Sequence, residues 1–230
     1  MDFGHVELET EPVVLYPETR VVRGPAESEY VPGDPLVGYA SLGRPLVLPL
    51  TPERVGDDKD LAAFIAAEAA HARYALVYLA CTFSPGAGER VARAWVMVDL
   101  SLTWPADAEV PIAWSMEPMR ASTQLNQNRT VSIKVPVGFV QATGQSGSTS
   151  TAEQIFCEAL GLQGSRPSWE FTDTKAQRLR GSHRLHLVVR APLAQGMAGL
   201  SLRAQVERRR LGLFSYTSDT DSARPIQFKV

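Results

Sequence analysis

Hydrophobic side chains recur at every second position along several stretches of this sequence. Successive side chains of an extended strand point to opposite faces, so alternation gives one apolar face and one polar face. The longest such stretch places these residues on one face: Ala94, Val96, Val98, Leu100, Leu102 and Trp104. Residues 131–139 alternate in the same way, and 183–189 and 200–206 are shorter strand candidates. The period predicts a mostly β chain.

Glycine and proline separate these strands at short intervals, which is typical of an antiparallel β-sandwich. Residues 74–83 and 91–104 flank a Ser-Pro-Gly-Ala-Gly turn, so we expect them to form a long hairpin. Residues 74–102 and 183–206 share a layout of strand, glycine-containing turn and alternating strand, which is a faint internal repeat. Pro12 interrupts the weakly alternating residues 5–15 and predicts a strand at a sheet edge.

One segment has helical rather than strand spacing. Leu61, Phe64 and Ile65 recur at helical intervals among alanines, and Asp57 or Asp58 is a suitable N-cap, so a helix is expected near 58–72. Residues 152–160 admit two interpretations. A capping pattern followed by apolar residues favours a short helix, and a strand is the alternative.

The length of 230 residues suits one β-rich unit over 1–230 or two smaller lobes. Residues 141–151 contain glycine, serine and threonine without charge, which is typical of a flexible linker. If there are two lobes, we expect them at 1–140 and 152–230.

The cellular setting is inferred from composition. No run of about 18 apolar residues is present, so no membrane-spanning helix is expected. The first residues are acidic rather than basic and apolar, so we expect a cytoplasmic protein. Cys81 and Cys157 lie in apolar stretches and are expected to be buried free thiols. The abundance of Ala, Gly, Val and Arg indicates a bacterial protein.

Charge is distributed unevenly although the net charge is only −2. Residues 1–115 hold 8 Lys and Arg against 17 Asp and Glu, a net of −9, and residues 116–230 hold 15 against 8, a net of +7. Such halves attract each other within one chain or between chains. The candidate basic surface comprises Arg178, Arg180, Arg184, Arg208, Arg209 and Arg210, and the candidate acidic segment comprises Glu7, Glu9 and Glu11.

Catalytic motifs are absent from the sequence. It contains no G-x-S-x-G, phosphate-binding loop, C-x-x-C or H-E-x-x-H pattern, so no metal site or cofactor is predicted. His183 and His186 lie three residues apart, which on a strand places them on opposite faces. A hydrolase would have to pair Cys157 with one of these histidines through tertiary folding.

The leading hypothesis is therefore a non-catalytic protein–protein interaction or assembly subunit of a larger bacterial complex, with a protein partner or self-association. The first alternative is binding of nucleic acid or another polyanion by the basic half, with Trp169, Phe171, Phe214 and Tyr216 as nearby aromatic residues. The second alternative is the hydrolase that uses Cys157 with His183 or His186.

Overall fold

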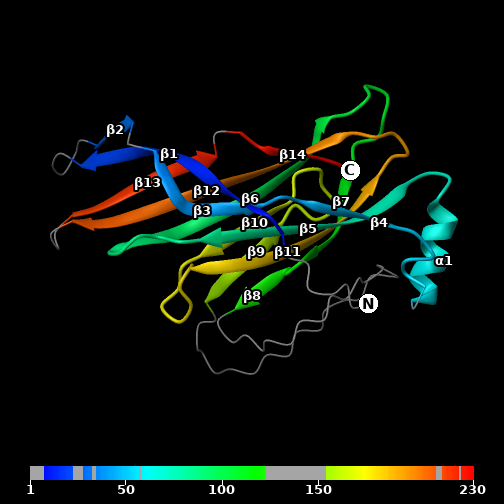
Figure 1. Cartoon of the computed structure of the whole chain (residues 1–230), viewed down its shortest axis with the longest axis horizontal. Helices are drawn as coiled ribbons and strands as arrows, with labels where there is room; N and C mark the ends of the chain where they lie inside the picture. Colours follow the sequence, from blue (N-terminus) through cyan, green and yellow to red (C-terminus); the bar gives the residue numbers. More distant parts are fainter. Residues whose placement is uncertain are drawn as a thin grey trace.

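The computed structural model describes residues 8–22, 28–32, 35–56, 58–122, 154–210, 214–222 and 224–230. Within these ranges 14 strands and one helix form an elongated molecule (Figure 1). Every strand pair is antiparallel. The expected strand of 131–139 and the linker of 141–151 lie outside the described residues.

The strands form two layers that face each other across a core, so the expected β-sandwich is confirmed. The first layer contains β3 (Leu36–Gly43), β4 (Leu46–Leu50), β5 (Arg73–Phe83), β7 (Ile112–Glu117) and β11 (Gly181–Ala191). The second contains β6 (Glu89–Thr103), β8 (Arg120–Ser122), β9 (Ile155–Leu160), β10 (Ser168–Thr172), β12 (Met197–Arg210) and β14 (Ile226–Lys229). The remaining strands are β1 (Thr10–Val22), β2 (Ser28–Pro32) and β13 (Phe214–Ser222).

The two layers are joined by paired strands along one side and by a short chain connection along the other. On one side β1 pairs with β3 of the first layer and then with β13, which pairs with β12 of the second. On the other side β7 pairs with β11, and after Pro118 and Met119 the chain continues as β8, which pairs with β9. The order of hydrogen-bonded strands therefore begins with β7 and ends with β8, which follow each other in the chain.

The prediction of an edge strand around Pro12 is wrong for β1 as a whole, because β1 has partners on both sides. Each proline nevertheless lies where only one neighbour is in register. Pro12 faces Ser41 of β3 before the pairing with β13 begins at Leu15, and Pro17 faces Thr220 of β13 beyond the pairing with β3. Proline lacks an N–H, and these positions do not require one on both sides.

The core between the layers is built by period-two burial. In β6 the predicted apolar face is buried at Ala94, Val96, Val98 and Leu100. These residues pack in one cluster with apolar residues of β5, β10, β11 and β12, including fully buried Trp169. Strands from before residue 122 pair with strands from after residue 154 in both layers, so the two described halves of the chain share this core.

The expected hairpin between residues 74–83 and 91–104 is wrong. β5 pairs with β3, β4 and β11 in the first layer, whereas β6 pairs with β10 and β12 in the second. The turn 84–88 carries the chain across the core instead. The faint repeat corresponds to two such crossings, β5 to β6 and β11 to β12, and their strands pair with each other in each layer.

The predicted helix is present as α1 (Lys59–Glu68), four residues shorter at its C-terminus than expected. Asp58 is its N-cap, and its side chain accepts a hydrogen bond from the Leu61 N–H at 3.0 Å. Leu61 and Ile65 pack on the outer face of the first layer in a second apolar cluster. No helix in the described ranges is both long and apolar enough to cross a membrane.

The helical interpretation of 152–160 is wrong, because residues 155–160 form strand β9. Its backbone is paired with β8 on one side and β10 on the other. Phe156, Cys157 and Ala159 are buried in the core. Tertiary pairing and burial override a local capping pattern here.

Arg73 forms hydrogen bonds to several backbone oxygens at the end of the molecule where the chain passes from β11 to β12. The Arg73 guanidinium donates to the carbonyl of Pro192 at 2.9 Å, to that of Ala194 at 2.6 Å, and to a backbone oxygen of Val230. The same end is tightened by Gly196, whose backbone lies so close to the Trp104 ring that a Cβ there would approach it to 2.3 Å.

We expect Arg73→Met to lower the free energy of unfolding by about 2–4 kcal/mol, because several carbonyl oxygens lose a charged donor. Urea denaturation of the purified chain measures this. The control is Arg54→Met, since Arg54 is exposed and should change stability by no more than about 0.5 kcal/mol. Equal stability of the two variants would show that this clamp is unimportant.

Candidate functional site

The candidate site lies at the end of the sandwich where two loops cross between the layers. Residues 84–88 connect β5 to β6, and residues 173–180 connect β10 to β11. The two crossings are adjacent because Gly181 pairs with Phe83 in one layer and Thr172 pairs with Arg93 in the other. We call this region the crossover end. Figure 1 shows α1 at the opposite end of the long axis.

A buried carboxylate organises the loop 173–180. The Asp173 side chain is only 3% exposed. One of its oxygens accepts from the Leu179 N–H at 2.7 Å, and the other accepts from Arg178 Nη1 at 2.8 Å. Leu179 is itself buried in the core. The carboxylate therefore holds both the backbone of the loop and the guanidinium of Arg178, whose side chain is 59% exposed.

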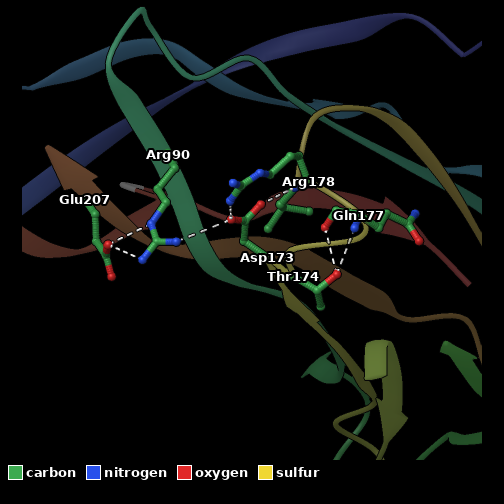
Figure 2. A network of polar contacts seen from close by, with 7 residues as sticks. Arg90, Asp173, Thr174, Gln177, Arg178 and Glu207 are labelled. Carbon is green, nitrogen blue, oxygen red and sulfur yellow. Dashed lines mark hydrogen bonds and ion pairs between the residues drawn. The ribbon is translucent and has the colours of Figure 1, made fainter. Parts of the chain in front are cut away.

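Arg90 connects this loop to β12. Its Nη1 lies 3.7 Å from the second Asp173 oxygen, and its Nε and Nη2 contact Glu207 Oε2 at 2.7 and 2.6 Å. Figure 2 shows Asp173 between the two arginines, with Glu207 beyond Arg90. Thr174 closes the loop because its hydroxyl donates to the Gln177 carbonyl and accepts from the Gln177 N–H.

Two hollows flank this network. The first has a volume of about 420 Å³ and is lined by Arg90, Arg178 and Arg180 together with Glu89, Asp173 and Glu207. The second has a volume of about 350 Å³, and the described residues that line it include the cations Arg90, Lys175 and Arg178 and one acid, Asp173. The charges of the first hollow therefore balance, whereas the second carries a net charge of +2.

Lys175 and Arg180 are the least compensated cations of the crossover end. Both are exposed. Within the part of the chain that the structure describes, neither forms an ion pair. They stand on either side of Arg178, one beside each hollow. An incoming anion would therefore displace no ion-pair partner from the described part of the chain.

The predicted basic residues do not form one patch. Arg178 and Arg180 lie in the crossover loop, whereas Arg184 is exposed on β11, opposite Ala80 of β5. Residues 208–210 end β12 and pair with β13, and only their backbone is described. Sequence reasoning missed Arg90 and Asp173 as site residues, because Arg90 belongs to the acidic half and nothing local marks a buried aspartate.

The predicted acidic segment is described in part. Glu7 lies outside the described residues, and Glu9 and Glu11 are exposed at the start of β1. The Glu9 carbonyl accepts from the Arg44 N–H, so the backbone here is held beside β3. These carboxylates therefore sit on a different strand from the crossover loop and face solvent.

The aromatic residues expected beside the basic region are not available to a ligand. Trp169 and Phe171 are buried in the core, and the Trp169 indole donates to the Pro118 carbonyl at 3.1 Å. The side chains of Phe214 and Tyr216 lie outside the described residues. Trp169 and Phe171 therefore cannot stack on the bases of a nucleic acid.

The cysteine and histidine placements give a hydrolase no accessible nucleophile. Cys81 and Cys157 are both buried free thiols, as expected. Burial, with a smaller contribution from the nearby Cys157, raises the pKa of the Cys81 thiol far above its ordinary value. His183 packs among phenylalanine rings facing the core, whereas His186 makes an edge-on contact with the Tyr78 ring on the other face, which agrees with the predicted opposite orientations.

A metal site is not suggested by the geometry. Among the described residues, no three His, Cys, Asp or Glu side chains are grouped so that they could hold an ion. What the crossover end can do chemically is bind: it presents fixed guanidinium groups and an ammonium group around two hollows.

Comparison with known proteins adds no family. No family model matches the chain, and no curated protein matches it. A solved structure described as a pore forming protein aligns with a TM-score of 0.30 and 10% identity, over 69% of this chain and 78% of its own. The Clostridium perfringens NetB toxin in its membrane inserted form aligns with a TM-score of 0.32 and 8% identity, over 96% and 94%. Neither score places this chain in a family.

We expect Asp173→Asn to lower the free energy of unfolding by about 1–3 kcal/mol, because an amide cannot balance the two guanidinium groups. Urea denaturation measures the change. Asp107→Asn is the matched control, since Asp107 is exposed in a turn. If the two variants lose the same stability, Asp173 does not organise the loop.

We expect neither thiol of the folded protein to react with iodoacetamide at pH 8 during the time that labels both thiols of the urea-unfolded chain. Burial keeps each sulfur away from the reagent and, at Cys81, keeps it protonated. Mass spectrometry counts the modified cysteines. Rapid labelling of Cys157 in the folded chain would instead revive the hydrolase hypothesis.

Proposed function

We propose that this protein is a non-catalytic interaction subunit of a larger assembly, and that it docks an acidic surface of a protein partner at the crossover end. The single observation that supports this most is the pair of uncompensated cations, Lys175 and Arg180, on either side of Arg178. These charges lie on a loop whose base is anchored in the core through Leu179.

Anchoring makes these charges useful for recognition. Flexible surface cations lose side-chain entropy when they bind, which offsets much of their electrostatic attraction. Asp173 already restrains Arg178, and the hydrogen bonds between Thr174 and Gln177 restrain the loop. A partner therefore meets a restrained loop and a restrained Arg178, whereas the Lys175 and Arg180 side chains still lose entropy on binding. The attraction between exposed charges decreases as salt is added.

A second copy of the chain is the partner that we favour. Exposed Glu9 and Glu11, at the start of β1, are complementary in charge to the crossover loop and belong to a different segment of the chain. Contact between two different surfaces of identical subunits is heterologous and builds rings or filaments. The division of the sequence into a half of net −9 and a half of net +7 supports the same arrangement.

Binding of a polyanion by the same cations is the competing function. Single-stranded nucleic acid is usually held by cations together with exposed aromatic rings on which bases stack. Trp169 and Phe171 cannot serve in this way, because both are buried. We therefore favour an acidic protein surface over nucleic acid.

We expect the double variant Lys175→Glu with Arg180→Glu to weaken binding of a fluorescent peptide of residues 1–16 at least about tenfold, by reversing both uncompensated charges. Fluorescence anisotropy measures the affinity. Raising NaCl from about 50 to about 300 mM should weaken wild-type binding in the same direction.

The matched control is Arg54→Glu with Lys59→Glu. It reverses the same number of exposed charges beside α1, away from the crossover end. Binding by this control should equal that of the wild type. The docking proposal is overturned if the peptide does not bind, if both double variants lose affinity equally, or if single-stranded DNA binds at the crossover end in place of the peptide.

A further inference from the structure

The two hollows of the crossover end differ in charge, and this difference identifies a ligand. We propose that the second hollow, between β10, Lys175 and Arg178, binds the phosphoryl group of a phosphate or phosphate monoester. The biological setting of this site rests on the proposed docking function, because the hollow belongs to the same surface. The ligand itself can be tested without any partner.

The second hollow carries a surplus of positive charge. Its lining carries three cations and one carboxylate, a net of +2. A phosphoryl group near neutral pH carries a charge of about −1.5 to −2 and three acceptor oxygens. Glu207, which lies outside this lining, compensates Arg90 through two nitrogens, so the effective surplus is about +1 rather than +2. A phosphoryl group is therefore favoured over a carboxylate by its third acceptor oxygen rather than by its charge.

Hydrogen-bond donors also remain available there. Arg178 reaches Asp173 through Nη1, which leaves Nε and Nη2 to form a fork that suits phosphate oxygens. Lys175 contributes an ammonium group, and the exposed amide of Gln154 and the hydroxyl of Thr172 complete the lining. The Thr174 hydroxyl is excluded as a donor, because it is engaged with Gln177.

The cations of this hollow are held in place by groups outside it. Glu207 binds Arg90 through two nitrogens, and buried Asp173 binds Arg178. These contacts hold the two guanidinium groups in fixed positions. The arrangement resembles a preformed receptor more than a flexible basic patch, which reduces the entropy lost on binding.

The first hollow provides an internal control on the same loop. It is larger, but Glu89 and Glu207 line it beside Arg180, so an entering anion meets repulsion as well as attraction. Removing the Arg180 charge should therefore leave phosphate binding unchanged, whereas removing the Lys175 charge should weaken it.

Isothermal titration with inorganic phosphate tests the site in the full chain. We expect saturable binding by the wild type, an affinity at least about tenfold lower for Lys175→Gln, and a change of less than about twofold for Arg180→Gln. Acetate should not compete. The proposal is overturned if no saturable binding occurs, or if Arg180→Gln weakens binding as much as Lys175→Gln.

A second titration separates the sources of the phosphoryl group. The peptide of residues 1–16 is compared with the same peptide phosphorylated at Thr10. A gain of at least about tenfold on phosphorylation, lost in Lys175→Gln, assigns the site to a phosphorylated side chain. Binding of inorganic phosphate without this gain assigns it to a free phosphate compound.

The same two titrations distinguish this inference from the docking function. If inorganic phosphate binds and the unmodified peptide does not, the phosphoryl site stands and the docking function fails. If the unmodified peptide binds and inorganic phosphate and phosphorylation have no effect, docking stands and the phosphoryl site fails.

Discussion

Burial of apolar side chains from the strands of two facing layers is the constraint on which the rest of this structure depends. A strand with period-two patterning can hide its apolar face only against a second layer. Here the second layer comes from the same chain, which crosses the core several times and also turns back beside itself, as at β9 and β10. β5 and β6 lie in different layers, as do β10 and β11, and β11 and β12. Each crossing leaves a loop at an end of the sandwich.

These crossings place the candidate site. The loops 84–88 and 173–180 are far apart in sequence, but the pairing of β5 with β11 and of β6 with β10 brings them to the same end. Arg90 then approaches Asp173 from the start of β6. A site of this kind needs no active-site motif, because its members are gathered by strand register alone.

Burial of the Asp173 carboxylate costs free energy, and its hydrogen bonds and ion pairs offset that cost. A carboxylate removed from water must be compensated by donors and cations. Asp173 receives a backbone N–H, one close guanidinium and a second more distant one. The outward consequence is a set of oriented cations around two hollows, and the surplus of charge in one of them gives the crossover end a preference for anions.

The sequence alone determined the mostly β class, the helix at α1 with an aspartate cap at 57 or 58, the buried face of β6 and the burial of both thiols. These follow from local periodicity and polarity, which are the same wherever a strand later pairs. Only the tertiary structure decided that β5 and β6 cross the core rather than pair, that residues 155–160 are a strand, and that Arg90, Asp173 and Arg178 meet. Those outcomes depend on which strands lie side by side, and strand partners are chosen by contacts between residues distant in the chain, which no local pattern encodes.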